Sequence, residues 1–130
     1  IICNYANADM VGHTGNMDAT IKSIEAIDEC IARLQKWSEE KDVDLMITAD
    51  HGNADQMHNE ETNTPKTSHS EAPVPFIIHS RKDYTLTKSG TLADIAPTIL
   101  NWLHVETPSE MTGKPLHKQS TNNKHIKERR

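Results

Sequence analysis

Short apolar runs alternate with one long amphipathic stretch along this chain. Runs of strand length lie at residues 1–5, 45–49 and 74–79. Between the first two runs, apolar side chains recur at steps of three and four over residues 18–40, which predicts a helix. The apolar positions of this predicted helix are Ile21, Ile24, Ile27, Ile31, Leu34 and Trp37. The pattern favours an α/β fold in which that apolar stripe packs against a sheet.

A second helix is predicted at residues 92–103, and its start has two interpretations. Thr91, followed three residues later by Asp94, resembles a capping box. With that start, Pro97 falls past the first turn and perturbs the helix, whereas a start nearer Asp94 avoids the conflict. The sequence leaves both starts open.

Polar clusters adjoin each of the three predicted strands. Asp9 and His13 follow the first strand, Asp50 and His51 follow the second, and His69 precedes the third. Side chains four residues apart, such as Asp9 and His13, converge on one ion from a helical turn or a compact loop. Open α/β sheets place ligands at the carboxyl ends of strands. Mixed carboxylate and imidazole donors suit Mn²⁺ or Zn²⁺ better than Ca²⁺ or Mg²⁺, so we expect a divalent metal at this rim.

Other candidate residues favour structural interpretations. Residues 54–73 form a long polar loop, typical of a segment that builds a site, and His58 within it is expected to be solvated. His79 ends the third predicted strand as a structural residue, and His104 lies near the negative end of the last helix.

Composition narrows the class of protein. A length of 130 residues suits one domain. Cys3 and Cys30 lie in apolar contexts and are expected to be buried, reduced thiols of a cytoplasmic protein, without a disulfide. No apolar run approaches the roughly 18–20 residues of a membrane span, and no signal peptide is visible, so we expect no membrane partner.

Charge divides the chain into an acidic body and a basic end. Residues 1–113 carry a formal charge of −10 and residues 114–130 carry +5. The end has no aromatic side chain, so residues 118–130 are predicted to be a disordered, solvated tail rather than a nucleic-acid or membrane patch. Residues 1–117 would form the domain. The acidic body, residues 1–113, holds only two arginines, Arg33 and Arg81, so it offers few guanidinium groups for binding an anionic ligand.

Five blocks together resemble one enzyme family. The sequence is similar to the 2,3-bisphosphoglycerate-independent phosphoglycerate mutases, a branch of the alkaline phosphatase superfamily. The blocks are residues 7–15, 48–57, 67–75, 92–98 and 111–116. The resemblance implies part of an alkaline-phosphatase-like sheet flanked by helices. Any single block would indicate only the superfamily, whereas the ordered set indicates the mutases.

The resemblance implies two metal sites. Asp9, His13 and His69 match the family's ligands to one Mn²⁺, and Asp50 and His51 match two ligands of the second. Zn²⁺, Co²⁺ or Mg²⁺ are the alternatives to Mn²⁺, and no 2,3-bisphosphoglycerate is required. The family's nucleophilic serine, a further aspartate ligand and an inserted, arginine-rich substrate domain all belong to the preceding part of the enzyme, so no catalytic nucleophile is assigned to these 130 residues.

The implied activity is that of a glycolytic isomerase. The family interconverts 2-phosphoglycerate and 3-phosphoglycerate through a phosphoserine, and it is usually monomeric and cytoplasmic. The chain opens with Ile1 inside an apolar run, so we expect a C-terminal part that is inactive alone. Phosphoglycerate is the expected partner, and nucleic acid is not.

Two rival interpretations stay open. One is another metal-dependent enzyme of the superfamily, such as a phosphopentomutase, a phosphodiesterase or an alkaline phosphatase. The block at residues 7–13 and the continuation at 54–57 favour the mutase over these. The other is a non-catalytic metal-binding module, which the coding sequence upstream of Ile1 would distinguish from an enzyme.

Overall fold

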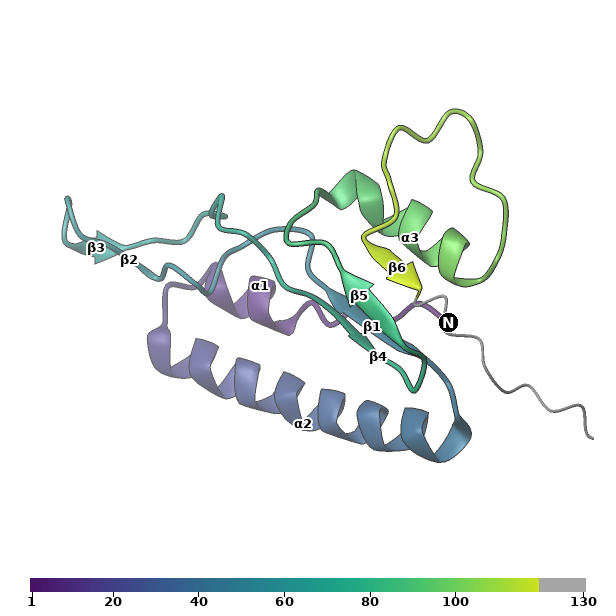
Figure 1. Ribbon diagram of the computed structural model, residues 1–130. Helices are drawn as coiled ribbons and strands as arrows, with labels where there is room; N and C mark the ends of the chain where they lie inside the picture. The colour runs from purple at the N-terminus through teal and green to yellow at the C-terminus, as the bar shows by residue number, and fades with distance from the viewer. Residues whose placement is uncertain (120–130) are drawn as a thin grey trace, which may run out of the picture. The chain divides into compact units, whose positions relative to one another are not determined.

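A computed structural model describes residues 1–119, which contain both helices and strands, so the predicted α/β class is confirmed (Figure 1). Contacts divide the chain into two compact units, Ile1–Ser80 and Arg81–Arg130. We call these the first and the second unit and describe each by itself. Within residues 1–119, no helix combines the length and the apolar character that crossing a bilayer requires.

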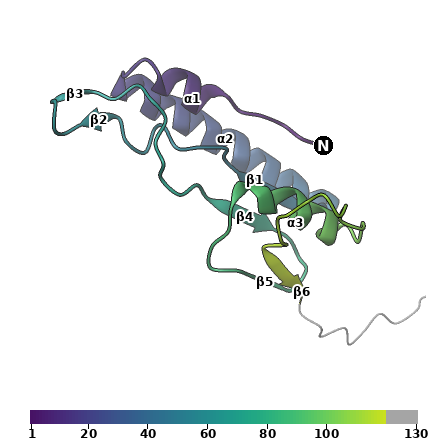
Figure 2. The same ribbon diagram turned by 90° about the horizontal axis from the view of Figure 1, so that it is seen from above.

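Two helices form one side of the first unit. Helix α1 covers Asn7–Gly12 and packs along α2, which covers Met17–Lys41, as both views show (Figures 1 and 2). The helix predicted at residues 18–40 is therefore confirmed. Its start is set by the Asn16 side chain, which accepts a hydrogen bond from the Ala19 N–H at 3.0 Å. Asp42, in the left-handed conformation, ends it.

The predicted burial of the α2 stripe is wrong in part. Ile21, Ile24 and Trp37 are exposed, whereas the buried side chains of this helix are polar: Thr20, Ser23 and Ser38. Within the described residues α2 contacts α1 and β1, which have 6 and 4 residues against the 25 of α2, so part of its apolar stripe stays uncovered.

One antiparallel pair of strands adjoins the polar segments that follow its first strand and precede its second. Strand β1, Leu45–Thr48, pairs with β4, Phe76–His79, with Thr48 opposite Phe76. These strands confirm the runs predicted at 45–49 and 74–79, and β4 begins directly after Pro75, which has no N–H to donate. The antiparallel register sets the carboxyl end of β1 beside the amino end of β4, so the polar segments next to those ends meet at one edge.

The strand predicted at residues 1–5 is absent. A strand needs a hydrogen-bonding partner, and none of the described strands pairs with this segment. Ile1 and Ile2 are almost fully exposed. The predicted burial of both thiols is also wrong, because Cys3 is exposed and Cys30 is half-buried, although both are free.

The segment predicted as a loop at residues 54–73 contains a small hairpin. Strands β2, His58–Asn59, and β3, Thr64–Pro65, pair antiparallel and project from the rest of the first unit in both views (Figures 1 and 2). The rest of the segment is irregular, as expected for a loop.

The second unit resolves the two starts of the last helix. Thr91 and Asp94 form the predicted capping box around a 3₁₀ turn, η1, at Leu92–Asp94. Helix α3, Ile95–Trp102, then begins after Asp94, so Pro97 lies in its first turn and removes no helical hydrogen bond. Both interpretations were therefore partly correct.

A second pair of strands in this unit was not predicted. Strand β5, Tyr84–Leu86, pairs antiparallel with β6, His117–Gln119. Both are short and lack a clear alternation of apolar and polar side chains. Strand β6 includes the first residues of the tail predicted at 118–130, and residues 120–130 lie outside the described part of the chain.

Candidate metal centre

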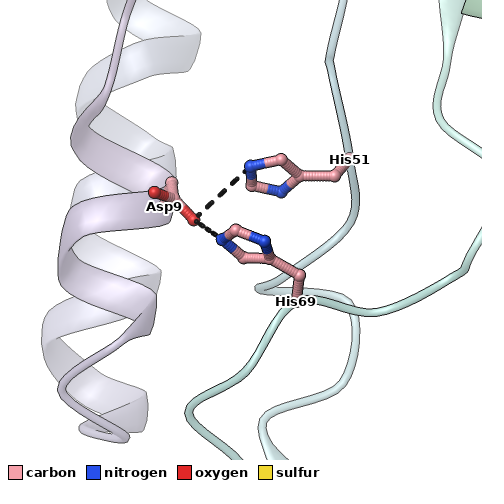
Figure 3. A group of neighbouring side chains, drawn as sticks. All are labelled: Asp9, His51 and His69. Atoms are coloured by element: carbon pink, nitrogen blue, oxygen red, sulfur yellow. Dashed lines mark ion pairs between the residues drawn. The ribbon is translucent and has the colours of Figure 1, made fainter.

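Three segments bring titratable side chains to one place in the first unit. Asp9 projects from α1, His51 lies in the turn after β1, and His69 lies in the segment that leads to β4. Figure 3 shows both imidazole rings pointing at the Asp9 carboxylate from the opposite side. The helical turn of α1 and its carboxyl-terminal cap also bring His13 to the same carboxylate.

One oxygen atom is the meeting point. Asp9 Oδ1 lies 3.2 Å from His13 Nε2, 3.1 Å from His69 Nε2 and 3.9 Å from His51 Nε2. The Nε2 atoms of His13 and His69 are themselves 3.1 Å apart. The rings of His51 and His69 stack with their centroids 3.6 Å apart. We call these four residues the Asp9 cluster.

Backbone carbonyls determine which way two of the rings present their lone pairs. His13 Nδ1 lies 2.5 Å from the carbonyl oxygen of Thr67. A carbonyl only accepts, so Nδ1 carries the proton and Nε2 presents a lone pair to the cluster. His51 Nδ1 makes a longer contact of the same kind, 3.3 Å, with the carbonyl of Gly52. This is the arrangement that orients imidazole ligands of metal ions.

The charged form of Asp9 is favoured in the cluster. Partial burial of the carboxyl raises its pKa, but the hydrogen bond from Asn53 and the neighbouring imidazoles act in the opposite direction. The net result is that the pKa of Asp9 lies below its ordinary value, so this residue is an anionic donor at neutral pH.

Asp50 lies at the edge of this arrangement. Its side chain is 86% exposed, and Oδ1 is 3.7 Å from His51 Nε2. Asp9, His51 and His69 offer donor atoms that all lie within 4.8 Å of one another. This group of three combines residues from both predicted metal sites. The two predicted ligand sets are therefore neighbours in space, with His51 between Asp50 and the Asp9 cluster.

The donors fit a divalent transition metal. Asp9 Oδ1, His13 Nε2 and His69 Nε2 form a triangle with edges of 3.1–3.2 Å. Two ligands at ~2.0–2.1 Å from a metal ion lie about 3.3 Å apart in a tetrahedral site and about 2.9 Å apart in an octahedral one. The triangle falls between these values. Neutral imidazole combined with carboxylate is the donor set of Zn²⁺, Mn²⁺ and similar ions.

Two other histidines lie outside the Asp9 cluster, and one residue that contacts Asp9 was not predicted. His58 Nε2 lies 3.2 Å from Asn63 Oδ1 in the hairpin, and His79 pairs with Glu39 at 3.2 Å. Neither histidine belongs to the Asp9 cluster. Asn53, which contacts Asp9 directly, was not singled out from the sequence. The signal available was an amide two residues after His51, within the same turn.

A family model described as "Metalloenzyme superfamily" matches residues 1–107. The chain belongs to the metalloenzyme superfamily. The convergence of a carboxylate and three imidazoles agrees with that membership, and the superfamily's name supports a metal cofactor of unspecified identity.

Curated relatives confirm the predicted resemblance. The chain is 52% identical over 116 residues to a 2,3-bisphosphoglycerate-independent phosphoglycerate mutase of Salmonella typhi. It is 50% identical over 119 residues to the enzyme of the same name from Francisella philomiragia. These alignments cover 89% and 91% of the chain, but only 23% of each relative. The chain therefore spans about a quarter of the length of these relatives.

A solved structure gives the same result. The chain superposes with a TM-score of 0.78 on a phosphoglycerate mutase of Leishmania mexicana, which was crystallised at low cobalt concentration. The sequences are 31% identical, and the match covers 90% of this chain and 24% of that one.

Proposed function

We propose that this chain is the metal-binding part of a phosphoglycerate mutase that needs no 2,3-bisphosphoglycerate. The reaction would interconvert 2-phosphoglycerate and 3-phosphoglycerate in the cytoplasm, with Mn²⁺ as the preferred cation. The observation that carries the proposal is the convergence of Asp9, His13, His51 and His69, all expected from the sequence as ligands, at one carboxylate oxygen. The names of the relatives supply the substrate.

The residues divide into two ligand sets in this proposal. Asp9, His13 and His69 would hold one cation, and Asp50 with His51 would contribute two ligands to a second. When bound, such cations lower the pKa of a nucleophilic hydroxyl and neutralise charge on phosphoryl oxygens. Asp9 supplies the negative charge and the imidazoles supply neutral lone pairs, so the ligands offset only part of the cation charge and leave the remainder for the phosphate.

The covalent step would use a serine from the part of the enzyme that the relatives have and these residues do not span. The serine hydroxyl loses its proton and its oxygen forms a bond to phosphorus as the bond from phosphorus to the glycerate oxygen breaks, and that glycerate oxygen takes up a proton to become a hydroxyl. The reverse transfer to the other glycerate hydroxyl completes the isomerisation. As metal ligands, His13, oriented by the Thr67 carbonyl, and His69 would each keep one ring nitrogen free of a proton, so acid should abolish metal binding.

The proposal is tested in the longest available polypeptide that contains these 130 residues. We expect conversion of 3-phosphoglycerate without added 2,3-bisphosphoglycerate, loss of activity on chelation, and recovery with Mn²⁺. His51→Ala should abolish the recovery, because it removes a donor of the cluster. His58→Ala is the matched control, since that exposed ring lies in the hairpin and contacts Asn63 rather than Asp9.

Two results would contradict the proposal. One is full activity in the chelated protein, which would remove the role of the metal. The other is turnover of a pentose phosphate or a phosphodiester in preference to phosphoglycerate, which would assign the chain to another metal-dependent enzyme of the superfamily.

A further inference from the structure

The turn at residues 52–55 contacts all three segments that carry the Asp9 cluster. It directly follows His51, its Asn53 side chain reaches Asp9 on α1, and its Asp55 side chain reaches the residue beside His69. We propose that Asn53 and Asp55 are positioning residues that hold Asp9 and His69 in the arrangement that binds metal. This inference rests on the proposed metal site.

Asn53 is placed to orient the Asp9 carboxylate. Its Nδ2 donates to Asp9 Oδ1 at 3.0 Å, the same oxygen on which the imidazoles converge. The side chain is only 6% exposed, so water does not compete freely for the bond. A donor at this position fixes the rotation of the carboxylate, which decides whether Oδ1 faces the rings.

Gly12 keeps Asn53 in place from the other side. A Cβ atom at residue 12 would collide with Asn53 Oδ1, so the amide lies directly against the α1 backbone. That oxygen is buried and has no hydrogen-bond partner among the described residues. An amide that leaves its oxygen unpaired while its nitrogen bonds Asp9 is held by that single bond and by close packing on Gly12.

Asp55 makes the equivalent link to the third segment. Ser70 Oγ lies 2.8 Å and 2.7 Å from the two carboxylate oxygens of Asp55, and the Ser70 N–H donates to the Gly52 carbonyl at 2.8 Å. A side chain at Gly52 would collide with both Ser70 and Asp55. Because Ser70 follows His69 directly, these bonds fix the backbone that presents the His69 ring to Asp9.

The test is a titration of the full chain with Co²⁺. Calorimetry measures the affinity, and visible absorption of the bound Co²⁺ reports its coordination. Asn53→Ala is expected to weaken binding by about 10- to 100-fold, the range typical of outer-shell ligands to a metal site. The Co²⁺ bands at saturation should also change, because a freely rotating Asp9 carboxylate alters the ligand geometry. Ser70→Ala is expected to act in the same direction by releasing Asp55.

Gly12→Ala gives an independent approach to the same contact. It should weaken Co²⁺ binding by displacing Asn53, and in an Asn53→Ala background it should have little further effect, because the collision partner is gone. Additive losses in the double variant would overturn the coupling.

Matched controls separate positioning from general destabilisation. Asn59→Ala removes an amide that accepts from the Glu61 and Thr62 N–H groups in the hairpin, and Ser80→Ala removes a serine–carboxylate pair with Asp44. Both should leave Co²⁺ affinity and absorption unchanged. Thermal unfolding of each metal-free variant shows that it is folded.

The outcomes distinguish two kinds of failure. If Co²⁺ binds and Asp9→Ala abolishes binding, while Asn53→Ala and Ser70→Ala leave affinity and spectrum unchanged, the positioning roles are wrong and the metal site stands. If the unaltered chain does not bind Co²⁺, or Asp9→Ala has no effect, the metal site and the positioning roles both fail.

Discussion

At the scale of single residues, one carboxylate oxygen organises the centre. Asp9 Oδ1 accepts from Asn53 and lies within 3.2 Å of imidazole nitrogens from His13 and His69. Asp9 Oδ1, His13 Nε2 and His69 Nε2 all carry lone pairs, so atoms this close together need either a shared proton or a cation between them. The pKa of Asp9 lies below its ordinary value, so the anionic form that a cation requires is present at neutral pH.

Asp9→Ala should therefore remove the metal site. The expected loss of Mn²⁺ or Co²⁺ affinity exceeds about 100-fold, the upper end of the range for outer-shell changes, because an anionic ligand is lost. Isothermal titration measures it. Asp28→Ala, which removes an exposed carboxylate from α2, is the matched control and should leave affinity unchanged. Equal affinities for the unaltered chain and Asp9→Ala would contradict the ligand role.

The sequence predicted the residues of the cluster better than their neighbours. Asp9, His13, His51 and His69 combine donor chemistry with positions beside strand ends, so their types alone indicated a metal. Asn53 and Thr67 have no such chemistry. The Asn53 amide becomes informative only because folding buries it against Asp9, and Thr67 acts through its backbone carbonyl, which every residue has.

At the scale of elements, Asp94 joins two segments of the second unit. Its carboxylate accepts from the backbone N–H groups of Thr91 and Lys114, each at 2.7 Å. These bonds, that of Lys114 first, hold the pKa of Asp94 below its ordinary value of 3.8. A lowered carboxyl pKa contributes stability that is complete above the unfolded-state value and is lost as pH falls through the folded-state value.

The second unit should accordingly lose stability in acid below about pH 4. Trp102 fluorescence reports its unfolding when Trp37 is replaced by Phe, so that one tryptophan remains. Asp94→Asn should be less stable at neutral pH and should lose part of the acid dependence, since the amide does not titrate. Identical acid profiles for the two proteins would show that Asp94 contributes nothing through its charge.

His117 acts on the same unit in a different range of pH. It is 4% exposed, neither ring nitrogen has a hydrogen-bond partner among residues 1–119, and its ring packs on Trp102 with centroids 4.7 Å apart. Burial lowers the pKa of His117 below 6.5. The unfolded chain therefore binds a proton before the folded one does, so stability falls as pH drops below 6.5 and levels off beneath the folded-state pKa.

His117→Leu should remove that pH dependence. At neutral pH it should also raise the free energy of unfolding by about 1 kcal/mol, because relief of an unpaired buried polar group exceeds the lost ring contact. Chemical unfolding at pH 5 and pH 8 measures both effects. His104→Asn is the control: His104 is exposed and left-handed, a conformation that Asn tolerates. A pH dependence that survives in His117→Leu would rule out this role.

Helix α2 was easier to predict than some of the strands for a physical reason. Helix α2 satisfies its backbone hydrogen bonds internally, and Asn16 caps it, so local sequence defined Met17–Lys41 to within a residue at each end. Strands depend on partners elsewhere in the chain. Residues 1–5 have an apolar strand pattern and no partner among the described residues, whereas β5 and β6 have weak patterns and pair with each other.

At the scale of the whole molecule, the first unit leaves several large apolar side chains exposed. Ile1, Ile2, Met10, Ile21 and Ile24 are all exposed. The chain also spans only about a quarter of the length of its curated relatives. The metal donors are nevertheless brought together by contacts within residues 1–80 alone.

The 130-residue polypeptide alone should not convert 3-phosphoglycerate. The family resemblance assigns the nucleophilic serine and the phosphate-binding arginines to parts of the enzyme outside these 130 residues. In addition, residues 1–113 carry a formal charge of −10, which repels an anionic substrate. A coupled assay for 2-phosphoglycerate measures this. Turnover by the purified polypeptide, with contaminating mutase excluded, would contradict the assignment.

Anomalous X-ray diffraction from crystals equilibrated with Mn²⁺ tests the central claim most directly. The account predicts a manganese peak bounded by Asp9, His13 and His69, with His51 and Asp50 lining a second, weaker position beside it. The contradicting result is a crystal at saturating Mn²⁺ with no peak at the Asp9 cluster, or with its manganese bound only at other carboxylates.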